Sequence, residues 1–234
     1  MNAHDLLALQ DLDSAIVAIA HRRPRLPELI ERKAAESAVQ QQRAGIAAAQ
    51  QRIDDAQRVI DGAEHESAYL VTRRTRLQAQ LKTVIAPREA EALMHQIEGL
   101  EARRVELDDV ELAALDEQAA ADGERAELEA SLPQLLAALD EASALWSAAD
   151  TALATEAADL QERRAAAATA LPPSDLEAYE RTRQHLDGVA VARLEGHHCS
   201  GCHLDLSPAE LDAVKGAPAG TVPECPQCGR FLVR

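Results

Sequence analysis

The stretch LKTVIAPREA (residues 81–90) separates two long heptad patterns and thereby determines the fold. Pro87 has no amide proton and disfavours helix at Ala86, so the first helix is expected to end here. Proline is accepted at the first position of a helix, so a second helix can start at once. Residues 27–85 and 88–146 form arms of 59 residues each on either side. We therefore expect the chain to fold back at Ala86–Pro87 into an antiparallel hairpin.

The apolar residues of both arms repeat with the heptad spacing of a left-handed coiled coil. The second arm carries such residues from Leu93 to Leu160, with a weaker stretch around Gln118. Many of the seam positions are alanine, so the helices can approach closely but bury little area in each layer. The two series of the first arm are Val39, Ile46, Ile53, Ile60, Ser67, Arg74 and Leu81, and Gln42, Ala49, Ala56, Ala63, Leu70, Leu77 and Val84.

Proline-rich stretches mark the two ends of the hairpin. RRPRLPEL (residues 22–29) ends a short first helix, about 4–21, which we expect to pack on residues 147–170. LPPSDLE (residues 171–177) ends the long helix, and Ser174 with Glu177 predicts a capping box for the next one. The predicted fold is mainly α, with a coiled-coil helical hairpin over residues 1–171 and a small separate domain over residues 172–234.

All four cysteines lie in this small domain, with the spacing C-x2-C-x22-C-x2-C. Each C-x2-C turn lets two thiolates point at one centre, and two turns complete a tetrahedral four-sulfur shell for zinc. Gly201 and Gly229 supply turns that tolerate unusual backbone angles. A closed four-thiolate shell stabilises the fold and leaves no coordination position to activate water. The predicted ligands of one structural zinc ion are Cys199, Cys202, Cys225 and Cys228.

Three other interpretations of the cysteines remain open from the residues alone. They are a redox C-x2-C pair, an iron–sulfur centre, and mixed ligation by His197, His198 or His203. The zinc interpretation is favoured because the spacing is close to a known zinc pattern and the βαβ context of a redox pair is absent. VAVARLE (189–195) and RFLV (230–233) predict short strands beside the cysteines, so we expect residues 172–234 to form a C-terminal zinc ribbon. In DLSPAEL (205–211), Ser207 and Glu210 predict a capped helix between the two turns.

Composition and charge restrict the class of protein. Aromatic residues make up 2% of the chain and the apolar fraction of 47% is mostly alanine and leucine, as in long helices. A net charge of −16 argues against a chain coated by nucleic acid. No apolar run is long enough to span a membrane, and acids stand where a signal peptide has bases. We expect a cytoplasmic protein without disulfides, and no catalytic motif is visible.

Charge is unevenly distributed along the hairpin. Residues 108–159 carry fourteen acids against one base, Arg125, a net of −13. Residues 71–90 carry five bases against Glu89, a net of +4, which makes the hairpin tip basic. Such runs can be solvated helix faces, or the tip can contact an acidic protein or a nucleic acid. Tyr69 is the one aromatic residue nearby, which gives little support to base stacking. The candidate contact residues are Arg73, Arg74, Arg76, Lys82 and Arg88.

The chain resembles a widespread bacterial family of four-cysteine zinc-ribbon proteins with a long N-terminal coiled-coil hairpin. The resemblance covers nearly the whole chain, and its most specific part is PREAEALMHQIEGLEARRVELDDVEL (residues 87–112). LLALQDLDSAI (6–16), CSGCHLDL (199–206) and CPQCGRFLV (225–233) also match. The resemblance implies a non-enzymatic protein that binds nucleic acid or acts as an adaptor for protein partners, including components of transcription.

Two functions follow as hypotheses. The favoured one is a cytoplasmic adaptor that binds protein partners through the coiled-coil rod and the ribbon. The alternative is RNA or DNA binding through the ribbon and the basic tip, and the acidity of this chain counts against it. The seam between the arms also allows self-association, whether the hairpin closes within one chain or pairs between two.

Overall fold

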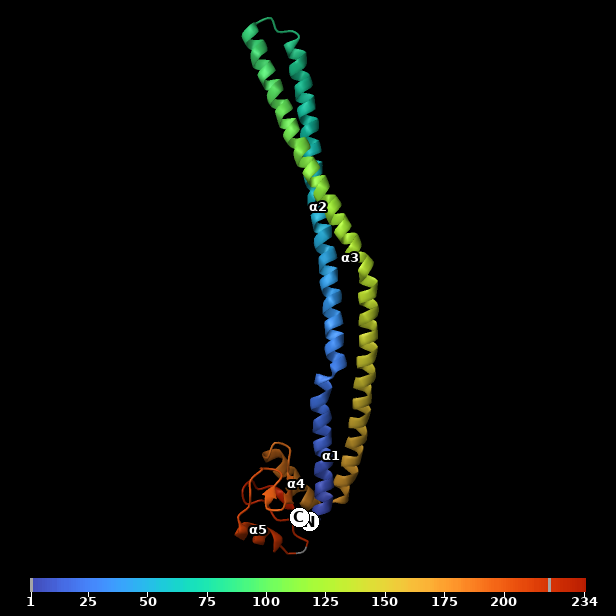
Figure 1. Ribbon diagram of the computed structural model, residues 1–234, viewed down its shortest axis with the longest axis vertical. Helices are drawn as coiled ribbons and strands as arrows, with labels where there is room; N and C mark the ends of the chain where they lie inside the picture. The colour runs from blue at the N-terminus through green and yellow to red at the C-terminus, as the bar shows by residue number, and fades with distance from the viewer. Residues whose placement is uncertain (1, 219) are drawn as a thin grey trace. The chain divides into compact units, whose positions relative to one another are not determined.

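The computed structural model describes residues 2–218 and 220–234, and most of them are helical (Figure 1). Contacts divide the chain into two compact units, which we call the rod unit (Arg32–Glu141) and the base unit (Met1–Glu31 with Ala142–Arg234). Among the described residues, no helix is both long enough and apolar enough to cross a bilayer. The elements are α1 (Ala3–Arg22), η1 (Arg23–Arg25), α2 (Pro27–Leu81), α3 (Pro87–Ala170), α4 (Pro173–His185), β1 (Val191–Glu195), β2 (His198–Cys199), α5 (Pro208–Lys215) and β3 (Phe231–Val233).

The rod unit is an antiparallel hairpin of α2 and α3, as the sequence predicts (Figure 1). The helices are joined by the few residues between Leu81 and Pro87, so the hairpin closes within one chain. Contacts between the arms join residues about equally far from this turn. The side-chain nitrogen of Gln118 donates a hydrogen bond to the side-chain oxygen of Gln57 at 2.8 Å. Nearer the turn, Arg103 Nε donates a hydrogen bond to the Glu66 carboxylate at 2.9 Å. This register is the one expected from a fold at Ala86–Pro87.

The heptad seam is confirmed, and its alanines are packed out of solvent. Ala49 and Ala121 are 1% and 0% exposed, which places the two backbones close together in these layers. Gln42, one of the polar seam residues, donates to the Leu128 carbonyl at 2.8 Å and to the Ser131 hydroxyl, and so helps to fix the register of the arms. α3 continues as one helix through Pro133.

In the base unit, α1 packs against the C-terminal turns of α3, as predicted. Ile19 and Leu26 form a buried cluster with Leu153 and Leu160, and Trp146 packs against it. Beside this cluster Arg23 donates two hydrogen bonds of 2.8 Å to the Asp150 carboxylate. The N-terminal segment therefore contributes a third helix to this end of the structure.

The capping box predicted for α4 is wrong. The helix begins at Pro173, its N-cap is Pro172, and no side chain caps it. Proline is well suited to the first helical position because the amide proton that it lacks would have no partner there. The N-cap therefore lies two residues upstream of the predicted one, at Pro172 instead of Ser174. Ser174 lies inside the first turn, where its hydroxyl contacts the Asp175 carboxylate at 3.5 Å.

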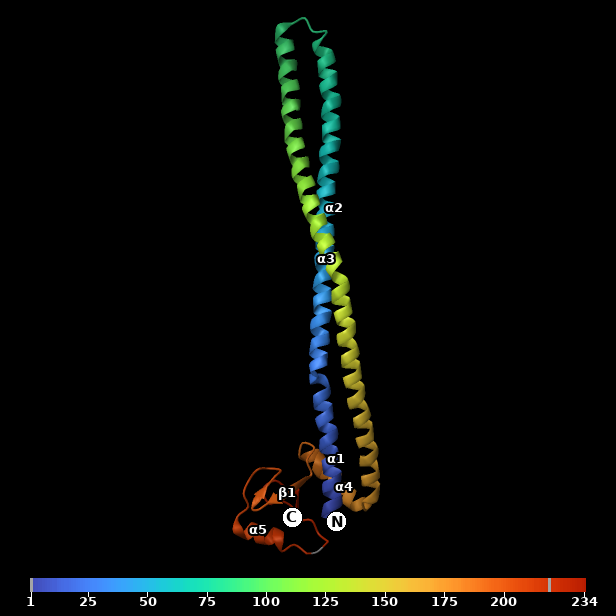
Figure 2. The same ribbon diagram turned by 45° about the vertical axis from the view of Figure 1, so that its right-hand side comes forward.

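A three-stranded sheet of order β2-β1-β3 completes the base unit, and Figure 2 labels its central strand, β1. β1 pairs antiparallel with β2 and parallel with β3. Successive side chains of a strand point to opposite faces. Val191 and Phe231 pack on one face against α1, α3 and α4. Ala192 and Leu232 pack on the other face with the cysteines. The sheet thus separates the helical core from the cysteine cluster.

Candidate metal centre

The two cysteine turns have matching backbone geometry. The His203 amide donates to the Cys199 carbonyl at 2.9 Å, and the Gly229 amide donates to the Cys225 carbonyl at 2.8 Å. Both donors have a positive φ, 60° at His203 and 75° at Gly229. Glycine adopts this conformation without strain, whereas a histidine pays a modest penalty. Each turn therefore directs its two thiols inward.

The four sulfur atoms fit one tetrahedral zinc ion. They all lie within 4.8 Å of one another, and Cys202 Sγ is 4.0 Å from Cys225 Sγ. Four sulfurs at the usual Zn–S distance of about 2.3 Å stand about 3.8 Å apart, so only a small contraction is needed. Cys199, Cys202, Cys225 and Cys228 therefore form the ligand set of one structural zinc. With four thiolates bound, zinc supplies stability and charge but no open coordination position.

The surroundings of the thiols favour a bound cation. Burial raises the pKa of the free Cys225 thiol to about 12, so its thiolate form needs a compensating positive charge at neutral pH. Burial also acts on Cys228, but its pKa is lowered because the backbone amide and the side chain of Arg230 donate hydrogen bonds to its sulfur. Arg230 Nε further donates to the Val189 carbonyl at 2.9 Å. Arg230 thus links the cysteine cluster to the segment that follows α4.

Gly201 is required by close packing. A Cβ atom at this position would lie 2.6 Å from Arg230 Cδ and 2.9 Å from Ala192 Cβ. Both distances are shorter than van der Waals contact, so a side chain here would displace Arg230 from its carbonyl partners. The glycine predicted as a turn residue therefore also makes room for the arginine that hydrogen-bonds Cys228.

The three nearby histidines lie outside the ligand cluster, which in the described part of the chain consists of cysteines alone. His198 Nδ1 lies 3.1 Å from an Asp205 carboxylate oxygen, and His197 Nε2 lies 3.6 Å from the other. The His203 ring lies against that of His198, with centroids 5.8 Å apart. These contacts brace the first cysteine turn and do not provide a metal ligand.

Gln10 joins α1 to the strand that carries the ribbon. Its side-chain oxygen accepts hydrogen bonds from the amides of Ala190 at 2.6 Å and Val191 at 3.2 Å, and its side-chain nitrogen donates to the Gly188 carbonyl at 3.2 Å. Gln10 is 3% exposed, and its partners Ala190 and Val191 are buried as well, whereas Gly188 is half-buried. Because a buried unpaired amide is costly, this one side chain fixes the position of the linker before β1.

Asp13, one turn further along α1, is the centre of a buried ion-pair network. Its carboxylate accepts hydrogen bonds from the Tyr179 hydroxyl at 2.7 Å and from Arg164 Nε at 3.1 Å. Arg183 Nη1 lies 3.7 Å from the same carboxylate and forms a second ion pair with it. Arg164 also pairs with Glu180. Burial and the hydrogen bond to Asp13 raise the pKa of Tyr179. α1, α3 and α4 are therefore held together by charge as well as by apolar contacts.

The importance of Gln10 and Asp13 was not anticipated from the sequence. A signal is nevertheless present, because Leu6, Leu9, Gln10 and Asp13 have the spacing of a single helix face. Two polar residues on an apolar face indicate buried hydrogen-bond partners elsewhere in the chain. Those partners lie more than 150 residues away, so the sequence does not identify them.

The structure brings the five candidate contact residues together at one end of the rod unit. Three lie in the last turns of α2, Lys82 follows its end, and Arg88 lies in the first turn of α3. Arg74, on the seam, pairs with Glu101 at 3.6 Å. Within the described residues, the other four, Arg73, Arg76, Lys82 and Arg88, are exposed and form no hydrogen bond or ion pair. Their role in binding stays a prediction.

Comparison with known proteins identifies the family. A family model described as the CT398-like coiled coil hairpin domain matches residues 9–187, and a model of the C4-type zinc ribbon domain matches residues 198–232. The chain belongs to the CT398-like hairpin family. Among curated proteins, the uncharacterized protein Rv2229c of Mycobacterium tuberculosis is 28% identical over 244 residues, which cover 98% of this chain and 94% of that protein.

Solved structures of similar proteins share the fold. CT398 from Chlamydia trachomatis superposes with a TM-score of 0.84 at 20% identity, covering 98% of this chain and 96% of that one. A protein from Mycobacterium smegmatis gives 0.79 at 24% identity and covers 99% and 97%. The HP0958 protein of Helicobacter pylori gives 0.64 at 15% identity and covers 98% and 95%. The family resemblance and the mainly α hairpin with a C-terminal ribbon are therefore confirmed.

Proposed function

We propose that this protein is a non-enzymatic, cytoplasmic adaptor whose hairpin tip and zinc ribbon bind protein partners. One observation carries the proposal: four exposed bases gather at the tip of the rod unit without an ion-pair partner among the described residues, whereas several bases further along it are paired. Arg52 pairs with Glu117 and Glu124, and Arg103 pairs with Glu66. Lys82 and Arg88, at the turn, have no such partner in the described residues. Unpaired charge at the end of a rod is available to an acidic partner.

The tip also offers an apolar contact. Ile85, between Lys82 and Arg88, is 97% exposed. Interfaces combine an apolar centre with a polar rim, and this arrangement is present here on a small scale. The ribbon supports a second contact because zinc holds its turns rigid, so less conformational freedom is lost on binding.

In-cell photo-crosslinking with mass spectrometry tests the adaptor function. A photoreactive amino acid replaces Ile85 in the full-length chain, and we expect crosslinks to a specific acidic protein. Lys82→Glu with Arg88→Glu should remove the crosslink. Lys33→Glu with Arg43→Glu is the matched control, since these two bases are exposed on the rod unit far from the tip. Crosslinks to no other protein, or crosslinks unaffected by the tip reversals, would overturn the proposal.

The same variants separate protein binding from nucleic-acid binding. If the tip binds RNA or DNA, the affinity of purified protein for a labelled oligonucleotide should fall steeply with salt, because each neutralised phosphate releases counterions. The tip reversals should then abolish binding while the control reversals leave it intact. That result without any protein crosslink would replace the adaptor function with the alternative. The identity of the crosslinked protein would also establish any link to transcription.

A further inference from the structure

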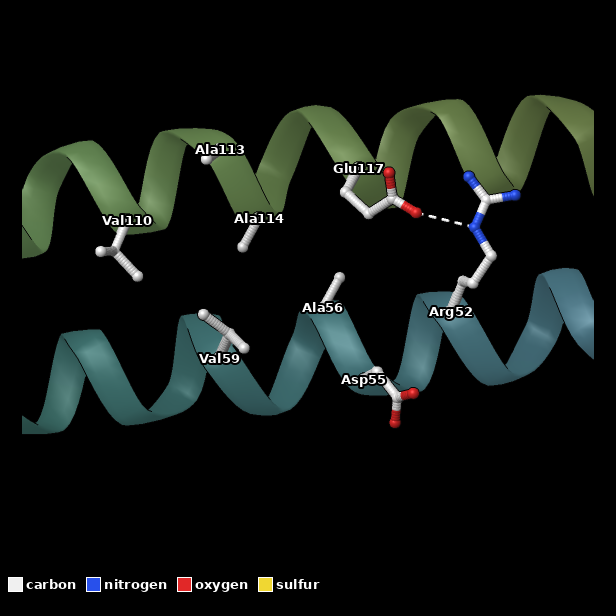
Figure 3. A pocket seen from close by; sticks show the side chains of 8 residues that line it. All are labelled: Arg52, Asp55, Ala56, Val59, Val110, Ala113, Ala114 and Glu117. Carbon is white, nitrogen blue, oxygen red and sulfur yellow. Dashed lines mark hydrogen bonds and ion pairs between the residues drawn. The ribbon is translucent and has the colours of Figure 1, made fainter.

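A shallow groove of about 460 Å³ lies between α2 and α3 in the rod unit (Figure 3). Ala56 and Ala114 point toward each other across it from facing helices, and Val59 with Val110 lies at one end. Both valines are nearly half exposed, at 45% and 46%. The groove exists because alanine side chains are too small to fill the space that the flanking valines leave open.

The surroundings of the groove are acidic. Arg52, the base on its rim, is already paired with Glu117 and Glu124. On α3, Asp109 and Asp116 each stand next to a groove-lining residue, Val110 and Glu117, and both are exposed and take part in no ion pair within the described residues. An apolar floor with unpaired acids beside it favours an apolar side chain flanked by bases.

The hairpin tip has this complementary chemistry. Ile85 is almost fully exposed, and Lys82 and Arg88 on either side of it are unpaired in the described residues. A single exposed isoleucine is ordinary by itself. It becomes significant because the groove of a second copy has an apolar floor for the isoleucine and acids beside it for the two bases.

The distance between tip and groove allows two copies to exchange these contacts. The groove centre lies 29 residues before Ile85 on α2, at Ala56, or about 40 Å along the helix. If two hairpins lie antiparallel and overlap by this length, each tip lies on the groove of the other. Both contacts form at once because a two-fold arrangement repeats every contact.

We propose that two copies of this chain associate antiparallel through the distal halves of their rod units. Ile85 of each copy contacts the groove of the other, and Lys82 and Arg88 lie against the acids beside it. This association goes beyond the adaptor function and does not depend on it, although both use the tip. A partner that binds the tip would then compete with the second copy.

Charges near the centre of the overlap are compatible with this arrangement. Residues seven apart share a face of a coiled-coil helix, so Arg52, Val59, Glu66 and Arg73 lie on the groove side of α2. The two-fold axis passes about 20 Å from the tip, near Arg73. Glu66, two turns away on the same face, pairs with Arg103 of its own chain and brings an opposite charge close to Arg73 of the other copy.

A reciprocal charge swap tests the proposal with purified, zinc-loaded, full-length protein. Lys82→Glu with Arg88→Glu makes the tip acidic, and Asp109→Arg with Asp116→Arg makes the groove side basic. Each variant alone should weaken the dimer about tenfold or more, because like charges then face each other. Mixed together, the two variants should associate again, since each tip meets a groove of opposite charge. Sedimentation equilibrium measures the dissociation constants.

Two controls test whether a weakened dimer instead results from misfolding or from the change in net charge alone. All four positions are exposed, so circular dichroism should show unchanged helix content. Lys33→Glu with Arg43→Glu changes the net charge as much as the tip variant, but both residues lie outside the overlap and the dimer should persist. Raised salt should dissociate the unaltered dimer, because exposed charges are screened.

A photoreactive residue at position 85 gives an independent test. In a mixture of isotopically labelled and unlabelled protein, crosslinks should join this position to residues 108–117 of the other copy. A monomer at every concentration would overturn the proposal. So would a dimer that the charge swap fails to restore, or crosslinks that lead elsewhere. In cells, crosslinks to the second copy alone would support this association while contradicting the adaptor function.

Discussion

Among the described residues of the rod unit, five of the nine buried apolar side chains are alanines, whereas the base unit buries several large side chains in a few shared clusters. Ala56 on α2 and Ala121 on α3 are both buried in the seam between the two helices. Because alanine is small, each layer of this seam removes little apolar area from water. In the base unit Leu6, Leu9 and Tyr179 are each 0% exposed within one cluster. Stability is therefore spread along the rod unit, while in the base unit it depends on a few residues that several elements share.

The comparison shows where single changes should matter. A substitution on the rod unit affects one layer, and its neighbours retain their contacts. A substitution at the metal centre or in the Asp13 network removes partners from two or three elements at once. We expect the effects to fall in that order.

The largest effect should come from Cys225→Ser. Loss of one ligand removes most of the apparent zinc-binding free energy, about 10–16 kcal/mol for structural sites, and the ribbon should unfold. Metal analysis and the dispersion of NMR amide signals measure this. The far-UV helical signal should remain nearly intact, as predicted for a hairpin domain over 1–171 and a separate domain over 172–234. His197→Ala, which alters an exposed side chain, should retain zinc. Complete loss of helicity in the cysteine variant would refute the boundary.

Asp13→Ala should be the next most harmful change. It removes the buried partner of Arg164 and Arg183, which keep their ion pairs with Glu180, and leaves Tyr179 only the longer contact with Gln10, at a cost of about 1–3 kcal/mol in the free energy of unfolding. Denaturant unfolding measures the change. Asp159→Ala breaks an exposed pair with Arg163 on the same helix and should have no measurable effect. Equal effects of the two substitutions would show that the network contributes no more than a surface pair.

Tyr179 should make the base unit sensitive to alkali. Its pKa is raised in the folded state by burial and by the hydrogen bond to Asp13, so the folded protein holds the proton more tightly than the unfolded chain. The contribution of Tyr179 to the free energy of unfolding should therefore not change with pH below about 10, the pKa of a tyrosine in the unfolded chain. It should fall as the pH rises above that value. Tyr179→Phe should remove this dependence. An unchanged pH profile in that variant would assign the effect to other groups.

The smallest effect, and of opposite sign, should come from Gly99→Ala on the rod unit. A Cβ atom there meets nothing within 4 Å, and the position lies inside α3. Alanine should stabilise the hairpin by about 0.5–1 kcal/mol, which thermal unfolding detects. At Gly45 the added Cβ would lie 3.1 Å from Leu128 Cδ1, so Gly45→Ala should gain less or destabilise. A large effect at Gly99 would contradict the view that rod layers act independently.

The rod unit and the metal ligands could be predicted from the sequence because their signals are local or periodic. Pro87 and the heptads specify the hairpin, and the paired cysteine turns specify the ligands. The contacts of Gln10 and Tyr179 could not be predicted, because they join residues that only the folded hairpin brings together. The start of α4 was missed because Ser174 and Glu177 satisfy the capping pattern while Pro173 satisfies another signal one residue earlier.

The hydrogen bonds from Gln10 to the linker before β1 have a consequence for the timing of folding. Its acceptor oxygen binds amides 180 and 181 residues further along the chain. At synthesis rates of about 5–20 residues per second, these amides emerge about 10–40 s after α1. During that interval Leu6 and Leu9 lack the strand that covers them, while both arms of the hairpin can already pair. Leu6 and Leu9 of the nascent chain therefore stay exposed until the strands that cover them have been synthesised.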